Sequence, residues 1–245
     1  MRLLSYNIHK GIGGRDRRYR IERIVEVIEA EAPDLVCLQE VDRDVRRTRH
    51  DDQPGKLAEA FRAAGSLYQQ NVHRKKGGGY GNLVLSRWPF RKTHQISLRM
   101  KRRKPRGAQL AEVETPEGPL RLVHWHLGLA ERERHWQVGH LLEHPLYRES
   151  DGLPTLIVGD YNDWRNTLAP GPFARHGFHQ VTSPRSRFRS FPANFPVLSL
   201  DKAFYHGPVQ VGHARIVRTA MARVASDHLP LVVDFHLGRG AAGGR

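Results

Sequence analysis

Residues 155–162 read TLIVGDYN, an apolar run that stops at an acid and an amide. The run predicts a buried strand, and a strand that ends in polar groups presents them at the rim of a sheet, where sites are built. Asp160 and Asn162 are two residues apart, so they face the same side of an extended chain. Asp160 could orient or deprotonate an attacking water, and Asn162 could donate its amide to a phosphate oxygen. The alternative is an ordinary Asx turn.

We call a short polar motif at the end of an apolar run a polar island, and residues 159–162 form the first one. Four other polar islands end apolar runs in the same way. They read SYN at 5–7, LQE at 38–40, HWH at 124–126 and SDH at 226–228. Carboxylates, amides and imidazoles that converge on one rim suit a divalent metal and a phosphate. A single island often arises by chance, whereas five of them, each after an apolar run, argue against coincidence.

The length and the net charge of the chain limit the number of domains and the kind of partner that we expect. The 245 residues carry a net charge of +15, and 39% of them are hydrophobic. The length, and the lack of a Pro-, Gly- or Ser-rich linker in the middle of the chain, predict one domain over 1–237. The Gly- and Arg-rich tail at 238–245 is expected to be disordered. The charge favours a polyanionic partner, either nucleic acid or an anionic membrane surface. A soluble enzyme from an Arg-rich proteome is the alternative reading.

The single cysteine, Cys37, excludes an internal disulfide. No apolar run approaches the length of a membrane-spanning helix, and we find no signal peptide ahead of the first island. We therefore expect a cytoplasmic protein, and a monomer.

Apolar periodicity predicts the elements between the islands. An amphipathic helix is expected over about 20–32, and further helices are expected over about 57–64, with Gly65 as the stop, and over 132–143. Strands are expected at 3–6, 35–39, 83–85, 108–114, 120–126, 155–158, 203–205 and 229–235. Strand–helix alternation near the start, followed by a hairpin signal at 115–119, favours mixed sheets.

With all five islands in order between Arg2 and about Phe235, the sequence resembles the endonuclease/exonuclease/phosphatase superfamily. Its members include deoxyribonuclease I, apurinic endonucleases, neutral sphingomyelinases and inositol polyphosphate 5-phosphatases. The resemblance implies an α/β (α+β) fold, a four-layer sandwich of two face-to-face mixed sheets flanked by helices, with the site at one end. It also implies a Mg²⁺- or Mn²⁺-dependent phosphoric ester hydrolase that uses direct water attack.

The resemblance also implies roles for the islands. Glu40 is expected to be the main metal ligand, Asn7 to help hold the metal or its water, and Asp227 to bind the metal or orient its waters. His126 and His228 are expected to face the phosphate. Whether His228 acts as the general base or as a cationic stabiliser stays open.

Several positions in or near the islands depart from the family pattern. Residues 201–204 read DKAF where the family usually shows DYIF. A buried Asp201 carboxylate would pair with His228, fix its tautomer and favour its cationic form. His124 stands two residues before His126 and is the alternative acting histidine. His9 occupies a place where some relatives carry an acid, which leaves a second metal contact open.

The densest basic run, residues 99–106, lies between two predicted strands. Clustered Lys and Arg neutralise phosphates, although a solvated loop is an equal alternative. The candidate substrate-binding residues are Lys10, Arg102, Arg103, Lys104 and Arg106, and 77–80 is a possible substrate loop. A nuclease on DNA or RNA is favoured. The alternatives are a phosphodiesterase or phosphatase acting on phospholipid or inositol-phosphate head groups, and a catalytically dead nucleic-acid-binding module, which would not need these acids and histidines.

Overall fold

The computed structural model describes residues 1–75, 77–150 and 152–238. Of the tail predicted to be disordered, only Gly238 is among these residues, and its N–H donates to the carbonyl of Pro208 at 2.7 Å. The prediction for 239–245 lies outside the described residues. No helix in the described part of the chain is long and apolar enough to cross a membrane.

Two six-stranded sheets form the body of the molecule. In spatial order the first contains β11 (Val209–Ile216), β12 (Leu231–Leu237), β1 (Arg2–Asn7), β2 (Leu35–Arg43), β4 (Gly79–Ser86) and β3 (Gly65–His73). The second contains β5 (Phe90–Ser97), β6 (Gly107–Thr115), β7 (Gly118–His126), β8 (Thr155–Asp160), β10 (Asp201–His206) and β9 (His179–Gln180). Each sheet has one parallel pair at its centre, β1 with β2 and β7 with β8, and antiparallel neighbours elsewhere.

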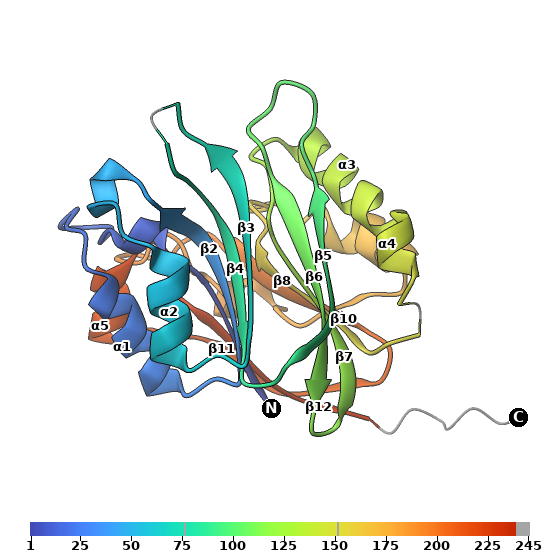
Figure 1. Cartoon of the computed structure of the whole chain (residues 1–245). Coiled ribbons are helices and arrows are strands. Elements are labelled where there is room, and N and C mark those ends of the chain that lie inside the picture. The colour runs from blue at the N-terminus through green and yellow to red at the C-terminus, as the bar shows by residue number, and fades with distance from the viewer. Residues whose placement is uncertain (76, 151, 239–245) are drawn as a thin grey trace, which may run out of the picture.

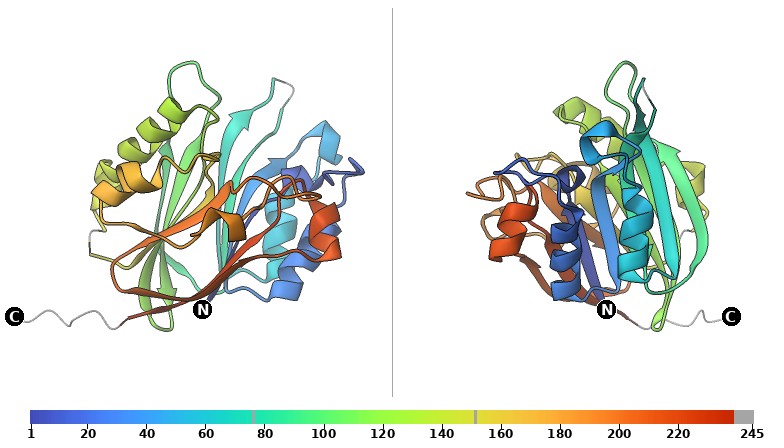
Figure 2. Two further views of the ribbon diagram at one scale, coloured as in Figure 1. Left: turned by 180° about the vertical axis from the view of Figure 1, so that it is seen from behind. Right: turned by 60° about the vertical axis from the view of Figure 1, so that its left-hand side comes forward.

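Helices cover the outer faces of both sheets (Figures 1 and 2). The first sheet is covered by α1 (Ile21–Glu31), α2 (Gln53–Phe61) and α5 (Ala220–Ala225), and the second by α3 (Glu131–Leu142), α4 (Pro145–Arg148) and the short turn η3 (Ala169–Phe173). Three short 3₁₀ turns lie in loops: η1 (His9–Gly11), η2 (Arg46–Thr48) and η4 (Arg185–Arg187). The predicted sandwich of two mixed sheets between helical layers is confirmed.

The first two helices show how local sequence sets their ends. Along α1, Ile21, Ile24 and Ile28 are buried at helical spacing. That helix stops where Ala32 turns left-handed at a φ of 45°. For α2 the predicted stop was wrong. The helix ends at Phe61 because Arg62 adopts a left-handed φ of 52°, and Gly65 begins β3 instead.

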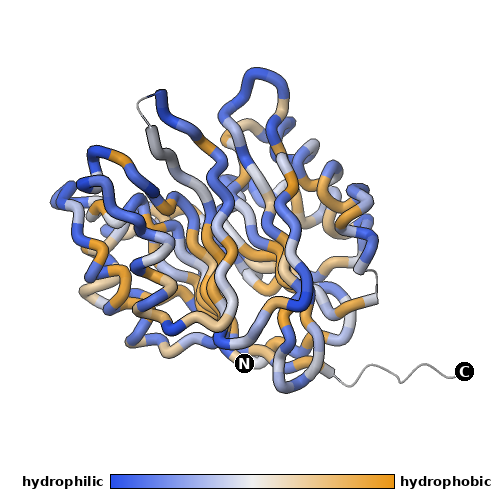
Figure 3. The backbone as a smooth tube through the Cα atoms, in the orientation of Figure 1, coloured by the Kyte–Doolittle hydropathy of each residue, from blue (hydrophilic) through white to orange (hydrophobic). Residues whose placement is uncertain are grey.

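The core lies between the sheets and under the helices. Figure 3 shows apolar residues along the central strands, whereas the hairpins at the upper end are hydrophilic. That upper end is where the parallel pairs finish, at Asn7 and Arg43 in one sheet and at His126 and Asp160 in the other. The fold therefore brings strand ends from both sheets to one edge of the sandwich.

Candidate active site

The carboxylate of Asp160, at the end of β8, is the centre at which the islands meet. Its residue is only 1% exposed. The Oδ2 atom accepts a hydrogen bond from Asn7 Nδ2 at 3.1 Å, and it lies 3.4 Å from His126 Nε2 and 3.7 Å from His228 Nε2. The Oδ1 atom accepts from the backbone N–H of Asn162 at 2.9 Å. Three of the four other islands, together with Asn162 of its own island, thus contact this one buried acid.

Strand register explains this convergence. In the first sheet Asn7 lies opposite Gln39, and in the second His126 lies opposite Asp160, so each parallel pair ends at the same level. Side chains beyond the carboxyl ends of neighbouring parallel strands share one edge, as in other sheets that bind ligands there. The two sheets face each other, so the two pairs of strand ends form one site.

Asp201 and His228 form the buried pair that the sequence suggested. Asp201 begins β10 opposite Asp160, and its Oδ2 lies 2.9 Å from His228 Nδ1. Burial by itself would lower the pKa of His228, but the carboxylates of Asp201 and Asp160 outweigh it and raise this pKa to about 10. The imidazole of His228 is therefore cationic at neutral pH. Its catalytic role stays a prediction.

His126, in contrast to His228, is neutral at neutral pH. Burial lowers its pKa well below the ordinary value, and the nearby cations Arg106 and His228 lower it further. Burial also raises the pKa of Asp160 to about 6, the largest of several effects on that group. At neutral pH the site therefore holds one neutral imidazole, one imidazolium and a carboxylate close to its titration range.

His124, the alternative acting histidine, is a bridge between the sheets. Its Nε2 lies 2.6 Å from Gln39 Nε2 of the first sheet, and its Nδ1 lies 2.9 Å from Gln109 Oε1. It is fully buried, and burial lowers its pKa to about 3. Of the two histidines on β7, the structure brings only His126 to Asp160.

Glu40 reaches the site through a break in its strand. The register of β2 against β4 shifts between Gln39 and Val41, and Glu40 adopts a left-handed φ of 59°. Bulges of this kind often redirect a side chain beside an active site. The Glu40 carboxylate forms an ion pair with the ammonium of Lys10. Burial alone would raise the pKa of Glu40, but the charge and hydrogen bond of Lys10 lower it.

The predicted metal ligands fit a hard divalent cation that keeps most of its water. Glu40 supplies a carboxylate and Asn7 supplies an amide oxygen. The Glu40 carboxylate already binds one cation, because it forms an ion pair with the ammonium of Lys10. Within the described residues, no three His, Cys, Asp or Glu side chains are grouped to hold a metal ion. Such a sparse set suits Mg²⁺, which is bound by one or two carboxylates together with water and substrate phosphate.

Asp227 lies to one side of this set. Its Oδ2 is 3.9 Å from His9 Nε2, and its side chain is 31% exposed. Asn7 Oδ1 accepts a hydrogen bond from the backbone N–H of His9 at 3.1 Å, so His9 lies next to the predicted metal ligand Asn7. The part played by Asp227 in metal binding stays a prediction.

The turn after β8 rests on a network that the sequence analysis missed. Asp163 is fully buried and accepts hydrogen bonds from the backbone N–H groups of Thr167 and Leu168 at 3.1 Å each. Lys202 Nζ donates to the carbonyl of Asp163 at 2.6 Å and to Asn166 Oδ1 at 2.6 Å. A lysine in place of the usual aromatic residue was the available signal.

Asn162 is held beside the site by its own hydrogen bonds to Asp160 and Leu127. Asn162 adopts a left-handed φ of 51°, and one N–H of its amide donates to the carbonyl of Leu127 at 3.0 Å. The second N–H of this amide makes no hydrogen bond within residues 1–75, 77–150 and 152–238, and it is available to a substrate oxygen. Burial lowers the pKa of Lys202 to about 8, although the carboxylate of Asp163 opposes this effect.

The five candidate substrate-binding residues separate into two groups. Lys10 and Lys104 lie with Arg47 around the ring of Tyr80, at 5.5, 5.2 and 5.4 Å from its centroid. Of the possible substrate loop at 77–80, Gly79 and Tyr80 lie in the strand β4, and Tyr80 is buried.

Arg106 is buried in the site. By contrast, Arg102 and Arg103 line a hollow of about 470 Å³ next to α3, together with Arg132. Only the first group, Lys10, Lys104 and Arg106, adjoins Glu40 and Asp160.

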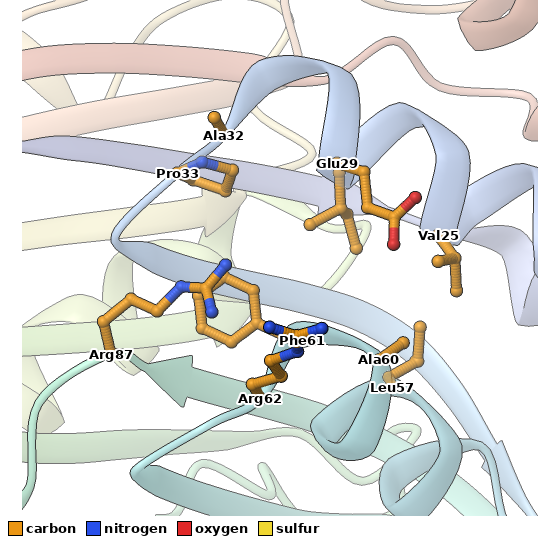
Figure 4. Close-up of a pocket in the computed structure, with 10 residues that line it drawn as sticks. Val25, Glu29, Ala32, Pro33, Leu57, Ala60, Phe61, Arg62 and Arg87 are labelled. Carbon is orange, nitrogen blue, oxygen red and sulfur yellow. The ribbon is translucent and has the colours of Figure 1, made fainter.

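A separate hollow lies on the outer layer, between α1 and α2 (Figure 4). It measures about 240 Å³ and is lined by apolar side chains, with Glu29, Arg62 and Arg87 among them. The guanidinium of Arg87 stacks on the ring of Phe61 at 4.2 Å. None of the five islands lines this hollow, so it is distinct from the candidate active site.

Comparison with known proteins agrees with this geometry. The sequence profile of the Endonuclease/Exonuclease/phosphatase family matches residues 4–228. The chain is 30% identical over 247 residues to the uncharacterized protein YbhP of Escherichia coli strain K12, with 96% of each chain covered.

Solved structures share the fold. An endonuclease/exonuclease/phosphatase from Beutenbergia cavernae gives a TM-score of 0.81 at 24% identity, covering 100% of this chain and 73% of that one. The mannosyl-6-phosphatase of Bacteroides thetaiotaomicron gives a TM-score of 0.73 at 16% identity, covering 96% and 99%.

Proposed function

Because the chain belongs to the endonuclease/exonuclease/phosphatase family of phosphoric ester hydrolases, we propose that it is a Mg²⁺- or Mn²⁺-dependent phosphodiesterase that cleaves nucleic acid. Members of this family generally depend on a divalent metal. The observation that carries the catalytic part is the buried Asp160 carboxylate between a neutral His126 and a cationic His228. That arrangement offers a proton acceptor and a cation within reach of one phosphate.

The proposed reaction assigns separate tasks to these groups. Ionised Asp160 takes the proton of the attacking water as the oxygen approaches phosphorus. His228, held by Asp201, and the free N–H of Asn162 stabilise the charge that builds on the non-bridging oxygens. The neutral imidazole of His126 orients Asp160 and the phosphate. A metal bound at Glu40 and Asn7 would neutralise the phosphate and the leaving oxygen.

Nucleic acid is favoured by the basic surface on both sides of the site. A hollow of about 980 Å³ is lined by Arg46, Arg47, Arg74 and Lys75, and the hollow beside α3 adds Lys101, Arg102, Arg103 and Arg132. The β3–β4 hairpin and the β5–β6 loop project at the same end of the sandwich, one from each sheet (Figure 1). Two basic flanks suit an extended polyanion better than a small phosphate ester.

An exposed aromatic ring supports the same substrate. Trp164 follows Asn162 by two residues and is 50% exposed, and the guanidinium of Arg165 lies 4.7 Å from its ring. Exposed aromatic rings beside a basic groove stack on nucleic-acid bases without regard to sequence. A phosphatase acting on a small monoester, as the name of the Bacteroides relative indicates for that protein, needs no such platform.

The first prediction concerns metal and substrate class. Chelation is expected to abolish hydrolysis, and Mg²⁺ or Mn²⁺ to restore it, across a panel of plasmid DNA, single-stranded DNA, RNA, sphingomyelin, phosphoinositides and a sugar phosphate. Glu40→Ala should raise the metal concentration needed for activity, because it removes the charged oxygen donor. The exposed Glu26→Gln on α1 is the control. Full turnover in excess EDTA would contradict the metal assignment, and turnover of lipid alone would replace nucleic acid as the substrate.

The second prediction concerns the basic flank beside α3. The double variant Arg102→Gln/Arg103→Gln is expected to weaken DNA or RNA binding at every sequence. The slope of log K against log salt should flatten by about 0.7–0.9 for each phosphate that the variant no longer neutralises. Hydrolysis of a small phosphodiester should change much less.

Arg91→Gln, at the exposed far end of β5, provides the matched control for the loss of positive charge. An unchanged salt slope in the double variant would make this flank a solvated loop. A loss of binding to anionic vesicles, with no cleavage of nucleic acid, would support the lipid alternative.

A further inference from the structure

The hollow between α1 and α2 combines an apolar floor with two arginines at its edge (Figure 4). Its volume is about 240 Å³. An apolar cavity of about 150 Å³ holds one benzene molecule, and pockets for drug-sized ligands begin near about 300 Å³. The hollow therefore has room for a small organic molecule with one ring or a short chain.

Apolar side chains from both helices form the floor of this hollow. Ile28 and Leu57 are buried, whereas Val25 is half-buried and Ala60 is exposed. Pro33, which lies just beyond the end of α1, belongs to the same lining and is buried. Apolar surface that still faces water is stabilised when a ligand covers it. The floor therefore favours a ligand with an apolar body.

Arg62 and Arg87 bring two positive charges to one side of the hollow. Both are exposed, and no ion pair within the described ranges includes either of them. The guanidinium of Arg87 lies 4.2 Å from the centre of the Phe61 ring, and Figure 4 shows the guanidinium of Arg62 next to the same ring. Because stacking already holds the Arg87 guanidinium in place, a ligand that binds it restricts the side chain less.

The helix ends offer another role for these arginines, because cations are favourable beside the carbonyl end of a helix and both helices end at the hollow. The final turns, however, are closed by backbone groups. The N–H of Ala32 donates to the carbonyls of Ile28 and Glu29, and the N–H of Arg62 donates to the carbonyl of Glu59. Within residues 1–75, 77–150 and 152–238 the Arg62 and Arg87 guanidinium groups donate no hydrogen bond, so their N–H groups are available to a ligand.

Glu29 limits the charge that the ligand can carry. It is the one acid among the lining residues that the structure describes, and Figure 4 places it on the α1 side, across from Arg62 and Arg87. Two guanidinium groups and one carboxylate leave one net positive charge around the hollow, which matches a monoanion. A second negative charge on the ligand would be repelled by Glu29. The two oxygens of a carboxylate match the paired N–H groups of a guanidinium.

We propose that this hollow binds a small apolar monocarboxylate. Its aliphatic chain or ring covers the floor between α1 and α2, and its carboxylate is bound by Arg62 and Arg87. The site consists of residues of the outer layer alone. It is therefore independent of the candidate active site and of the substrate that the active site hydrolyses.

The first test is calorimetric titration of octanoate into the wild-type protein, with acetate, octanol and octylamine as comparison ligands. Octanoate is expected to bind at least about 10-fold more tightly than each of the others, because it alone joins an apolar body to a negative charge. The methyl NMR signals of Val25 and Leu57 should shift as octanoate is added. Equal binding of octanol, or no binding of octanoate, would overturn the proposal.

The second test uses variants of the lining. Arg62→Gln/Arg87→Gln is expected to weaken octanoate binding on the order of 10-fold, because charged donors are removed from a partly exposed site. Arg91→Gln, in the second sheet, is the matched control for lost positive charge and should bind as the wild type does. Ala60→Trp keeps both arginines but fills the hollow, so it should abolish binding. Because Ala60 is exposed, this variant should keep the wild-type Tm.

Wild-type octanoate affinity in the double arginine variant or in Ala60→Trp would overturn the proposal, as would an equal loss in Arg91→Gln. If Ala60→Trp fails to fold, Ala60→Leu, which fills less of the hollow, carries the comparison. A second copy of this chain is the competing occupant of the apolar floor. Sedimentation would assign the hollow to an interface between copies, and refute the carboxylate site, if it showed a dimer that Ala60→Trp abolishes and octanoate leaves unchanged.

Discussion

Asp160→Asn is expected to lower kcat by about 10²- to 10⁴-fold on the best substrate, because the amide cannot take the proton of the attacking water. The loss should not come from unfolding. Asp160 is buried, and burial raises its pKa, so the fold disfavours the charge that the substitution removes. The Tm of the variant at neutral pH should therefore equal or exceed that of the wild type, and Glu26→Gln should change neither quantity.

The pH profile gives an independent check on the same residue. A base with a pKa of about 6 is protonated below that pH, so wild-type kcat/KM should fall as the pH drops through 6. On the alkaline side, activity should fall only when His228 loses its proton near pH 10. Asp160→Asn should lose the acid limb. Near-wild-type kcat in this variant, or an acid limb that survives the substitution, would assign the proton transfer to another group.

His228→Ala is expected to lower kcat on the order of 10²- to 10³-fold, because a cation that stabilises the charged phosphate is removed. Asp201→Asn should act through that imidazole, since the Asp201 Oδ2 atom lies 2.9 Å from His228 Nδ1. The two residues work as a unit, so the double variant should be little worse than His228→Ala alone. Steady-state kinetics of the four proteins in this cycle measure the coupling.

A pH profile again distinguishes positioning from mere support of the fold. In Asp201→Asn the alkaline limb should move below pH 10, because the carboxylate that raises the pKa of His228 has gone. Losses that simply multiply in the double variant would show that Asp201 and His228 act separately. An alkaline limb that stays in place would show that Asp201 does not set the charge of the imidazole.

The strands that the sequence analysis missed share a physical property. They are β3, β5, β9 and β11, the strands at the four edges of the two sheets. An edge strand has one neighbour and much solvent contact, so its sequence carries little of the apolar pattern on which prediction depends. Central strands such as β1, β2, β7 and β8 are buried on both faces and were all predicted, because their apolar runs are continuous.

The candidate site was visible in the sequence for a similar reason. Each polar island directly follows a buried run, so its position at a strand end is local information. The Lys202–Asp163 contact was not visible, because the two residues are far apart in the chain and meet only across β8 and β10. The burial of Arg106 likewise depends on the three-dimensional arrangement, since the sequence shows only one of several arginines in a basic loop.

The sequence by itself determined the family, the mixed sandwich and the set of reactive side chains, because apolar runs and the residues that end them are local features. Tertiary structure alone decided which histidine reaches Asp160 and which histidine bridges the sheets. It also decided the charges in the site, since a pKa depends on burial and on groups brought from other strands. Asp160, His126 and His228 therefore differ from their ordinary protonation behaviour only once both sheets have packed together.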